Sequence, residues 1–72
     1  MKTRLYAIKC DQGYIRYREG LSEQTGLNKA SVYLRPDDPV LIDALSAASR
    51  AGNSNPRVVE LILEEKDYHR KG

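Results

Sequence analysis

Few side chains of the kinds that perform covalent chemistry are present in this sequence. The 72 residues include one histidine, His69, and one cysteine, Cys10. A general base must be held at a fixed distance from its substrate, and a position as near the C-terminal end as His69 is hard to fix in that way. Cys10 has no histidine near it in the sequence. We therefore expect a small, half-buried apolar residue there rather than a nucleophile.

The other polar clusters also have structural explanations. Asp37 and Asp38 are adjacent, but they precede a predicted helix, and capping accounts for them. The glycines match no phosphate-binding pattern. A single cysteine can form neither an intramolecular disulfide nor a cysteine-based metal cluster, and no other ligands have the required spacing. We therefore expect no catalytic, cofactor-binding or metal-binding residues and a protein that is not an enzyme.

The distribution of charge is the remaining indication of function, and the charges are unevenly distributed along the chain. Residues 1–36 contain seven basic and three acidic residues, whereas residues 37–72 contain five basic and seven acidic ones. A basic half can meet nucleic acid or an acidic protein, although a solvated surface is the commoner explanation of such a bias. The residues most suited to contact a protein partner or duplex DNA are Arg16, Arg18, Lys29, Ser31, Tyr33 and Arg35.

Length and hydropathy limit the architecture. We expect a single small domain over residues 1–72, with residues 67–72 as a frayed tail. No apolar stretch has the length of a transmembrane helix or resembles a signal peptide, so the expected protein is cytoplasmic and makes no membrane contact. Chains this short bury only about 60% of the surface that their unfolded form exposes. A second copy, in a homodimer, is a plausible source of further stability.

The N-terminal quarter predicts a β-hairpin. Residues 4–10 and 14–18 are rich in aromatic and β-branched residues, and Asp11 and Gly13 suit the turn between them. A two-residue loop places Ile8 opposite Ile15, whereas a three-residue loop with a bulge suits Gly13 better. The sequence leaves this register open.

The middle of the chain predicts a loop, a strand and a helix. Residues 19–28 contain two glycines and no sustained period, which favours a loop or a single helical turn. In residues 30–35, alternation predicts a strand with Val32 and Leu34 on its apolar side. Asp37 or Asp38 then caps a helix that ends near Gly52 and Asn53.

The segment 56–65 decides between two folds. As a strand, its β-branched run would complete a small sheet, with Pro56 at the start where no backbone donor is needed. As a helix, it would follow a cap at Ser54 or Asn55 and form one apolar stripe that leaves Leu61 exposed. Periodicity cannot choose between these for so short a run.

Residues 27–33, Leu-Asn-Lys-Ala-Ser-Val-Tyr, are similar to a motif in small phage and prophage proteins of uncharacterised role. The resemblance extends over residues 5–65, with an opening hairpin at 5–9 and 13–15 and a closing strand at 57–61. It implies a β-β-β-α-β module that performs no catalysis and binds a host or phage macromolecule.

A second resemblance covers residues 30–67, which are similar to ribbon-helix-helix repressors. It implies an obligate dimer whose paired strands enter the DNA major groove, with Ser31, Tyr33 and Arg35 facing the bases. Residues 26–33 also resemble the turn and recognition helix of helix-turn-helix repressors, although this requires a helical N-terminus.

We favour an α+β fold, a small β-β-β-α-β sheet with one covering helix. Only this arrangement gives the opening hairpin further strands and a helix to pack against, and an isolated hairpin is marginal in water. The expected function is a binding or accessory module that acts through a macromolecular contact. The alternative is a dimeric ribbon-helix-helix DNA-binding regulator, with the N-terminal hairpin added to it.

Overall fold

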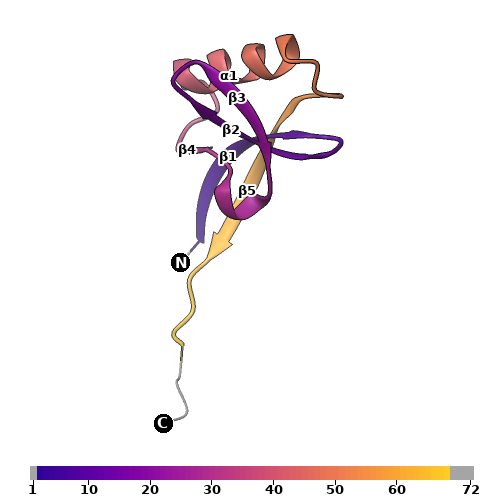
Figure 1. Cartoon of the computed structure of the whole chain (residues 1–72). Coiled ribbons are helices and arrows are strands. Elements are labelled where there is room, and N and C mark those ends of the chain that lie inside the picture. Colours follow the sequence, from indigo (N-terminus) through magenta and orange to yellow (C-terminus); the bar gives the residue numbers. More distant parts are fainter. Residues whose placement is uncertain (1, 69–72) are drawn as a thin grey trace.

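The protein is a five-stranded antiparallel sheet with one helix packed on it, as the α+β prediction requires (Figure 1). The computed structural model describes residues 2–68, so His69 and residues 70–72 of the predicted tail lie outside the described residues. The elements are β1 (Lys2–Cys10), β2 (Gly13–Arg18), β3 (Leu21–Thr25), the short 3₁₀ helix η1 (Leu27–Lys29), β4 (Val32–Tyr33), α1 (Pro39–Arg50) and β5 (Arg57–Glu64). No helix among residues 2–68 has the length and apolar character needed to cross a bilayer.

Strand β1 is the centre of the sheet and pairs with three others. Along one edge it pairs with β5 from Lys2 to Lys9. Its other edge is shared: Lys9 and Cys10 pair with β2, while Tyr6 and Ala7 pair with β4. Because β2 leaves β1 after two residue pairs and β3 pairs only with β2, the sheet bends sharply between the two halves.

The opening hairpin has the two-residue loop, Asp11 and Gln12, and the three-residue alternative is wrong. The pairs Lys9 with Tyr14 and Cys10 with Gly13 set this register. Gly13 has a φ of 150°, and a Cβ at this position would lie 3.0 Å from the carbonyl oxygen of Thr25. Glycine is therefore required by both conformation and close approach.

Residues 21–25 form a strand where the sequence predicted a loop. The turn before it has positive φ at Glu19 and Gly20, the conformation of a two-residue hairpin turn whose twist matches the strands. Five registered pairs, from Tyr14 with Thr25 to Arg18 with Leu21, then join β3 to β2. Hydrogen bonds between backbone groups form these pairs, so an edge strand can form without alternating apolar residues in its sequence. The predicted single helical turn is present only at η1.

The strand predicted over residues 30–35 is reduced to Val32 and Tyr33, and its faces are the reverse of those expected. Val32 is 48% exposed and Leu34 76% exposed, whereas Tyr33 packs against the core. The reason is the register with β1. Tyr33 lies opposite Tyr6, on the face that carries Ile8, so it points toward the helix side of the sheet.

Helix α1 begins and ends as its local sequence predicts. The Asp38 carboxylate, rather than that of Asp37, accepts a hydrogen bond from the backbone N–H of Val40 at 2.8 Å, and Pro39 occupies the first turn. Beyond the C-cap Ala51, Gly52 has a φ of 85°, the left-handed conformation that commonly ends a helix.

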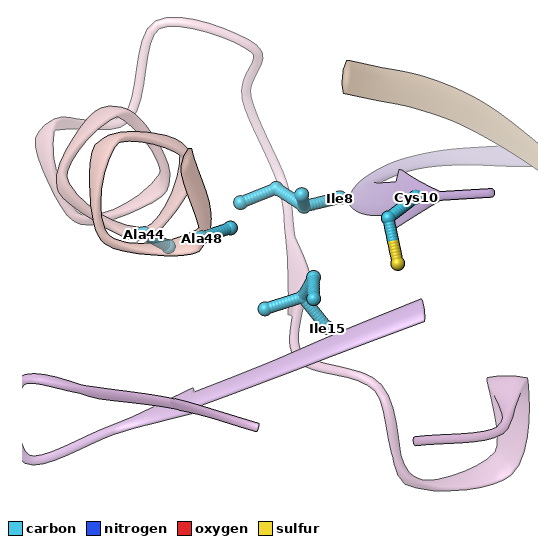
Figure 2. Packing of buried hydrophobic residues seen from close by; sticks show 5 residues of the cluster. All are labelled: Ile8, Cys10, Ile15, Ala44 and Ala48. Carbon is cyan, nitrogen blue, oxygen red and sulfur yellow. The ribbon is translucent and has the colours of Figure 1, made fainter. Parts of the chain in front are cut away.

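The core lies between α1 and the adjoining face of the sheet. Figure 2 shows Ala44 and Ala48 of α1 directed toward Ile8 and Ile15, with Cys10 beside them. All five are at most 1% exposed. Full burial of each isoleucine stabilises the fold by about 1.5–3 kcal/mol. The alanines let the helix backbone approach the sheet closely, so these two positions have little room for larger side chains.

The C-terminal apolar segment is a strand, as the predicted β-β-β-α-β sheet requires. Residues Arg57–Glu64 of β5 pair with eight consecutive residues of β1, from Lys9 back to Lys2. The second helix that a ribbon-helix-helix chain requires at this position is therefore not formed.

Enlarging a core alanine tests the close approach of α1 to the sheet. We expect Ala48→Leu to lower the free energy of unfolding by about 1–3 kcal/mol, because the added methyl groups must displace Ile8 and Ile15. The same substitution at Ala51, which is exposed at the helix C-cap, is the matched control and should cost under about 0.5 kcal/mol. Urea denaturation measures both, and equal losses would contradict this packing.

Candidate functional site

Two of the predicted contact residues, Ser31 and Tyr33, serve the interior of the protein. The Ser31 hydroxyl accepts a hydrogen bond from the backbone N–H of Tyr17 at 2.8 Å and lies 3.3 Å from the Tyr17 carbonyl oxygen. The backbone N–H of Ser31 also donates to the carbonyl of Ile15. Ser31, which directly precedes β4, therefore holds this segment to β2 where β2 diverges from β1. Tyr33 packs against the core cluster of Ile8 and its neighbours.

Arg35 is exposed, but its guanidinium group is already paired. Nε and Nη2 donate to the two carboxylate oxygens of Asp37 at 3.0 and 2.9 Å, a bidentate arrangement. Together with Asp38 and Pro39, these residues line a solvent-open hollow at the start of α1. A ligand that used Arg35 there would compete with Asp37 for it.

The other three predicted residues lie on β2 and η1. Lys29 ends η1, and Arg18 ends β2 with its side chain exposed. Arg16 is half-buried on β2 and lies opposite Glu23 of β3. The structure thus does not bring the six predicted residues together into one surface.

The most distinctive surface is a sheet face that no helix covers. In an antiparallel pair, residues directly opposite each other share a face. Leu5 pairs with Leu61, Thr3 with Leu63, and Ala7 with both Val59 and Val32. Ile8 and Cys10, which face α1, belong to the other side of the strand. We call this second surface the open face; its residues are Thr3, Leu5, Ala7, Val32, Val59, Leu61 and Leu63.

Apolar side chains remain accessible over much of the open face. Leu63 is 51% exposed, and Leu5, Val59 and Leu61 are half-buried. Only Ala7 is fully buried, between its larger registered neighbours Val32 and Val59. The lower ends of β1 and β5 extend away from α1 as a two-stranded ribbon (Figure 1). Contiguous apolar surface of this kind is typical of binding sites in small proteins.

Positive charge gathers at one end of the open face. Lys9 and Arg57 lie directly opposite each other on β1 and β5, a like-charge pair that is unfavourable by itself. The Lys9 ammonium lies 5.4 Å from the centre of the Tyr14 ring, and Arg57 Nη1 lies 3.3 Å from a carboxylate oxygen of Asp11. Both contacts offset the repulsion in part. We call Lys9, Tyr14 and Arg57 the basic end of the open face.

The described residues offer no arrangement suited to holding a metal ion. Residues 2–68 contain no group of three or more histidine, cysteine, aspartate or glutamate side chains placed for that purpose. Cys10 is buried and accepts a hydrogen bond from the Gln24 amide at 3.6 Å, while its thiol lies 3.9 Å from Asn53 Oδ1. This surrounding makes the thiol part of the packing between β1, β3 and the end of α1.

Sequence reasoning missed the open face, although one signal for it was present. The run Val58-Val59 and Leu61-Ile62-Leu63 contains apolar residues on both sides of a strand, and such a strand is normally covered on both faces. The described part of the chain has a single α-helix, and it packs on one side of the sheet. The residues of the uncovered face can be identified only when the register between β1 and β5 is known.

Comparison with protein-family models, with curated proteins and with solved structures finds no match to this chain. The interpretation of the site therefore depends on its own geometry.

The buried side of β4 can be tested by titration. Burial raises the pKa of the Tyr33 phenol above its ordinary value of 10.0, with smaller contributions from Asp38 and Tyr17 in the same direction and a hydrogen bond to Ser31 that opposes them. Above pH 10 the unfolded chain loses this proton while the folded chain retains it. We therefore expect the free energy of unfolding to decrease as the pH rises from about 10 toward the folded pKa.

Urea denaturation of Tyr33→Phe over the same pH range checks this assignment. Tyr33→Phe should lose part of this decrease in the free energy of unfolding, since it has no phenol proton to retain. An unchanged pH dependence in Tyr33→Phe would show that the Tyr33 ring is not buried against the core.

Proposed function

We propose that this chain is a non-enzymatic binding module that docks a protein partner on its open face. The observation that carries the proposal is that α1 packs against Ile8 and Ile15 on one face of the sheet, whereas no helix packs on the apolar row of the other face, which has Leu5 and Leu61 at its centre. Burying such a row against a partner removes apolar surface from water, which is the main driving force of protein association.

The chemistry of the open face also describes the partner. Its centre is apolar, so it fits an apolar strip, whereas the basic end fits an acidic group. A carboxylate placed between Lys9 and Arg57 would relieve their mutual repulsion, and it would be partly shielded from water by the Tyr14 ring. The proposed partner is therefore a protein surface with an apolar core and an acidic residue at one edge.

Several contacts favour a protein partner over duplex DNA. Of the three side chains that the ribbon-helix-helix resemblance directs at bases, Ser31 and Tyr33 face the interior and Arg35 is bound to Asp37. Affinity for duplex DNA comes mainly from cations that neutralise successive phosphates. The open face places its cations at one end only, beside leucine and valine side chains.

An accessory role of this kind agrees with the resemblance to small phage and prophage proteins, which implies binding to a host or phage macromolecule. It also requires no catalytic group, which matches the expectation from the sequence that the protein is not an enzyme.

Site-specific photo-crosslinking tests the proposal. Leu63 and Ile62 are neighbours on β5 with similar exposure, 51% and 60%, but they lie on opposite faces of the sheet. A photoreactive side chain at position 63 in the producing cells should give a discrete adduct with a different protein, and one at position 62 should give no such adduct. Lys9→Glu in the same chain should weaken the adduct, because it reverses the charge at the basic end.

Two results would contradict this function. Equal adducts from both positions would show that contact is not specific to the open face. Fluorescence anisotropy showing that the purified chain binds a DNA duplex at low salt, with the affinity falling steeply as salt is added, would favour the regulator instead.

A further inference from the structure

The outer edge of β5 is the longest sheet edge that residues 2–68 leave unpaired. Along Arg57–Glu64 the strand pairs with β1 on one side only. Its backbone N–H and C=O groups on the other side are therefore free to form a ladder with another strand. We propose that a second copy of this chain pairs with this edge, β5 against β5 and antiparallel, with Leu61 on the two-fold axis. This homodimer goes beyond the proposed function, because it uses the strand edge rather than the open face.

Charge complementarity selects this register. With Leu61 opposite itself, Val59 lies opposite Leu63, and Arg57 lies opposite Glu65 of the second copy. Because the pairing is symmetric, the Arg57 and Glu65 pair occurs twice, once at each end of an apolar row. Opposite-charge pairs across antiparallel strands stabilise the sheet. On the other face, Glu60 meets Ile62 and Val58 meets Glu64, so no like charges are directly opposite.

The neighbouring registers of the β5 pair lack this match of opposite charges. In a symmetric pair whose two-fold axis is perpendicular to the sheet, side chains on one face of the first copy must continue the same face of the second. This condition is met only when one residue of β5 lies opposite itself on the axis. The alternative registers are therefore those with a different residue on the axis. With Glu60 on the axis, two glutamates face each other. With Ile62 on the axis, Glu60 lies opposite Glu64 twice. With Val59 on the axis, the overlap shrinks to residues 57–61. The charges on β5 therefore disfavour the two adjacent registers.

The other free edges cannot pair with themselves in this way. Self-pairing of β3 about its centre would place Glu23 opposite Glu23. On the free edge of β1, between Lys2 and Leu5, self-pairing about Thr3 opposes Lys2 and Arg4, and self-pairing about Arg4 opposes that residue to itself. Among the free strand edges of residues 2–68, β5 is the one that combines an apolar centre with a cation at one end and an anion at the other.

A second copy would also offset the repulsion between Lys9 and Arg57 at the basic end. Arg57 already contacts Asp11 at 3.3 Å, and its side chain remains 40% exposed. The Glu65 carboxylate of a second copy would supply a second anion beside Lys9 and Arg57. Dimerisation would also join the two open faces on the same side of one continuous sheet, doubling the surface available to a partner.

Complementary charge reversals test the register. Arg57→Glu places two carboxylates opposite each other at both ends of the interface, and Glu65→Arg places two guanidinium groups there. Each variant alone should self-associate roughly tenfold more weakly than the unaltered chain, because two attractive pairs become repulsive. An equimolar mixture of the two variants should recover dimers, since both opposite-charge pairs form again between unlike chains. Sedimentation equilibrium measures all three samples.

Two controls separate the interface from effects within one chain. Glu64→Arg makes the same charge change one residue earlier, on the other face and opposite Val58, and should leave the dimer intact. Asp11→Asn removes the contact that Arg57 makes within its own chain and should also leave it intact. Circular dichroism and thermal unfolding establish that every variant is folded.

A chain that stays monomeric at millimolar concentration overturns the inference, as does a mixture that associates no better than its components. Mass that grows beyond a dimer with concentration would instead indicate head-to-tail pairing of unlike edges. None of these results alters the expected difference between crosslinks from Leu63 and Ile62 to another protein, so the dimer and the proposed function can fail separately.

Discussion

The hydrogen-bonding capacity of β1 is the constraint on which the rest of the structure depends. Three of the other four strands pair with it, and the remaining one, β3, is reached through β2. Because β2 and β4 share one edge of β1, β2 must leave β1 after the pair of Lys9 with Tyr14 so that β4 can pair with Tyr6 and Ala7. The resulting bend turns the β2–β3 hairpin against α1, with Ser31 joining the two parts.

The bend concentrates the core at one end of the molecule. Ile8, Ile15 and the alanines of α1 occupy the space that it encloses, while the lower halves of β1 and β5 extend beyond the helix. This chain therefore exposes leucine and isoleucine on its ribbon for a structural reason, since 12 helical residues cannot cover a strand pair of this length. Both the open face and the β5 edge remain exposed because no further helix or strand of the described chain packs against them.

The features that the sequence predicted are those encoded by neighbouring residues. Asp38, Pro39 and Gly52 mark the ends of α1 through capping and left-handed backbone, which depend on a few adjacent positions. The α+β class followed from a similar local argument, because the opening hairpin needed further strands to be stable. The conformation of residues 57–64 was different. Its apolar pattern suited both a strand and a helix, and pairing with β1, some fifty residues away, decided the outcome.

The candidate site escaped prediction because cross-strand register determined each of its parts. Alternation in residues 31–35 was read correctly as two faces, but the assignment of those faces was reversed, since Tyr33 rather than Leu34 meets the core once β4 pairs with Tyr6. The open face also depends on strand register, because its leucines and valines come from β1, β4 and β5. Charged residues are conspicuous in a sequence, yet here Arg35 is paired with Asp37, and the cations beside the apolar row, Lys9 and Arg57, are 48 positions apart. In a sheet this small, a binding surface is a property of the pairing between strands, so it becomes visible only when the register is known.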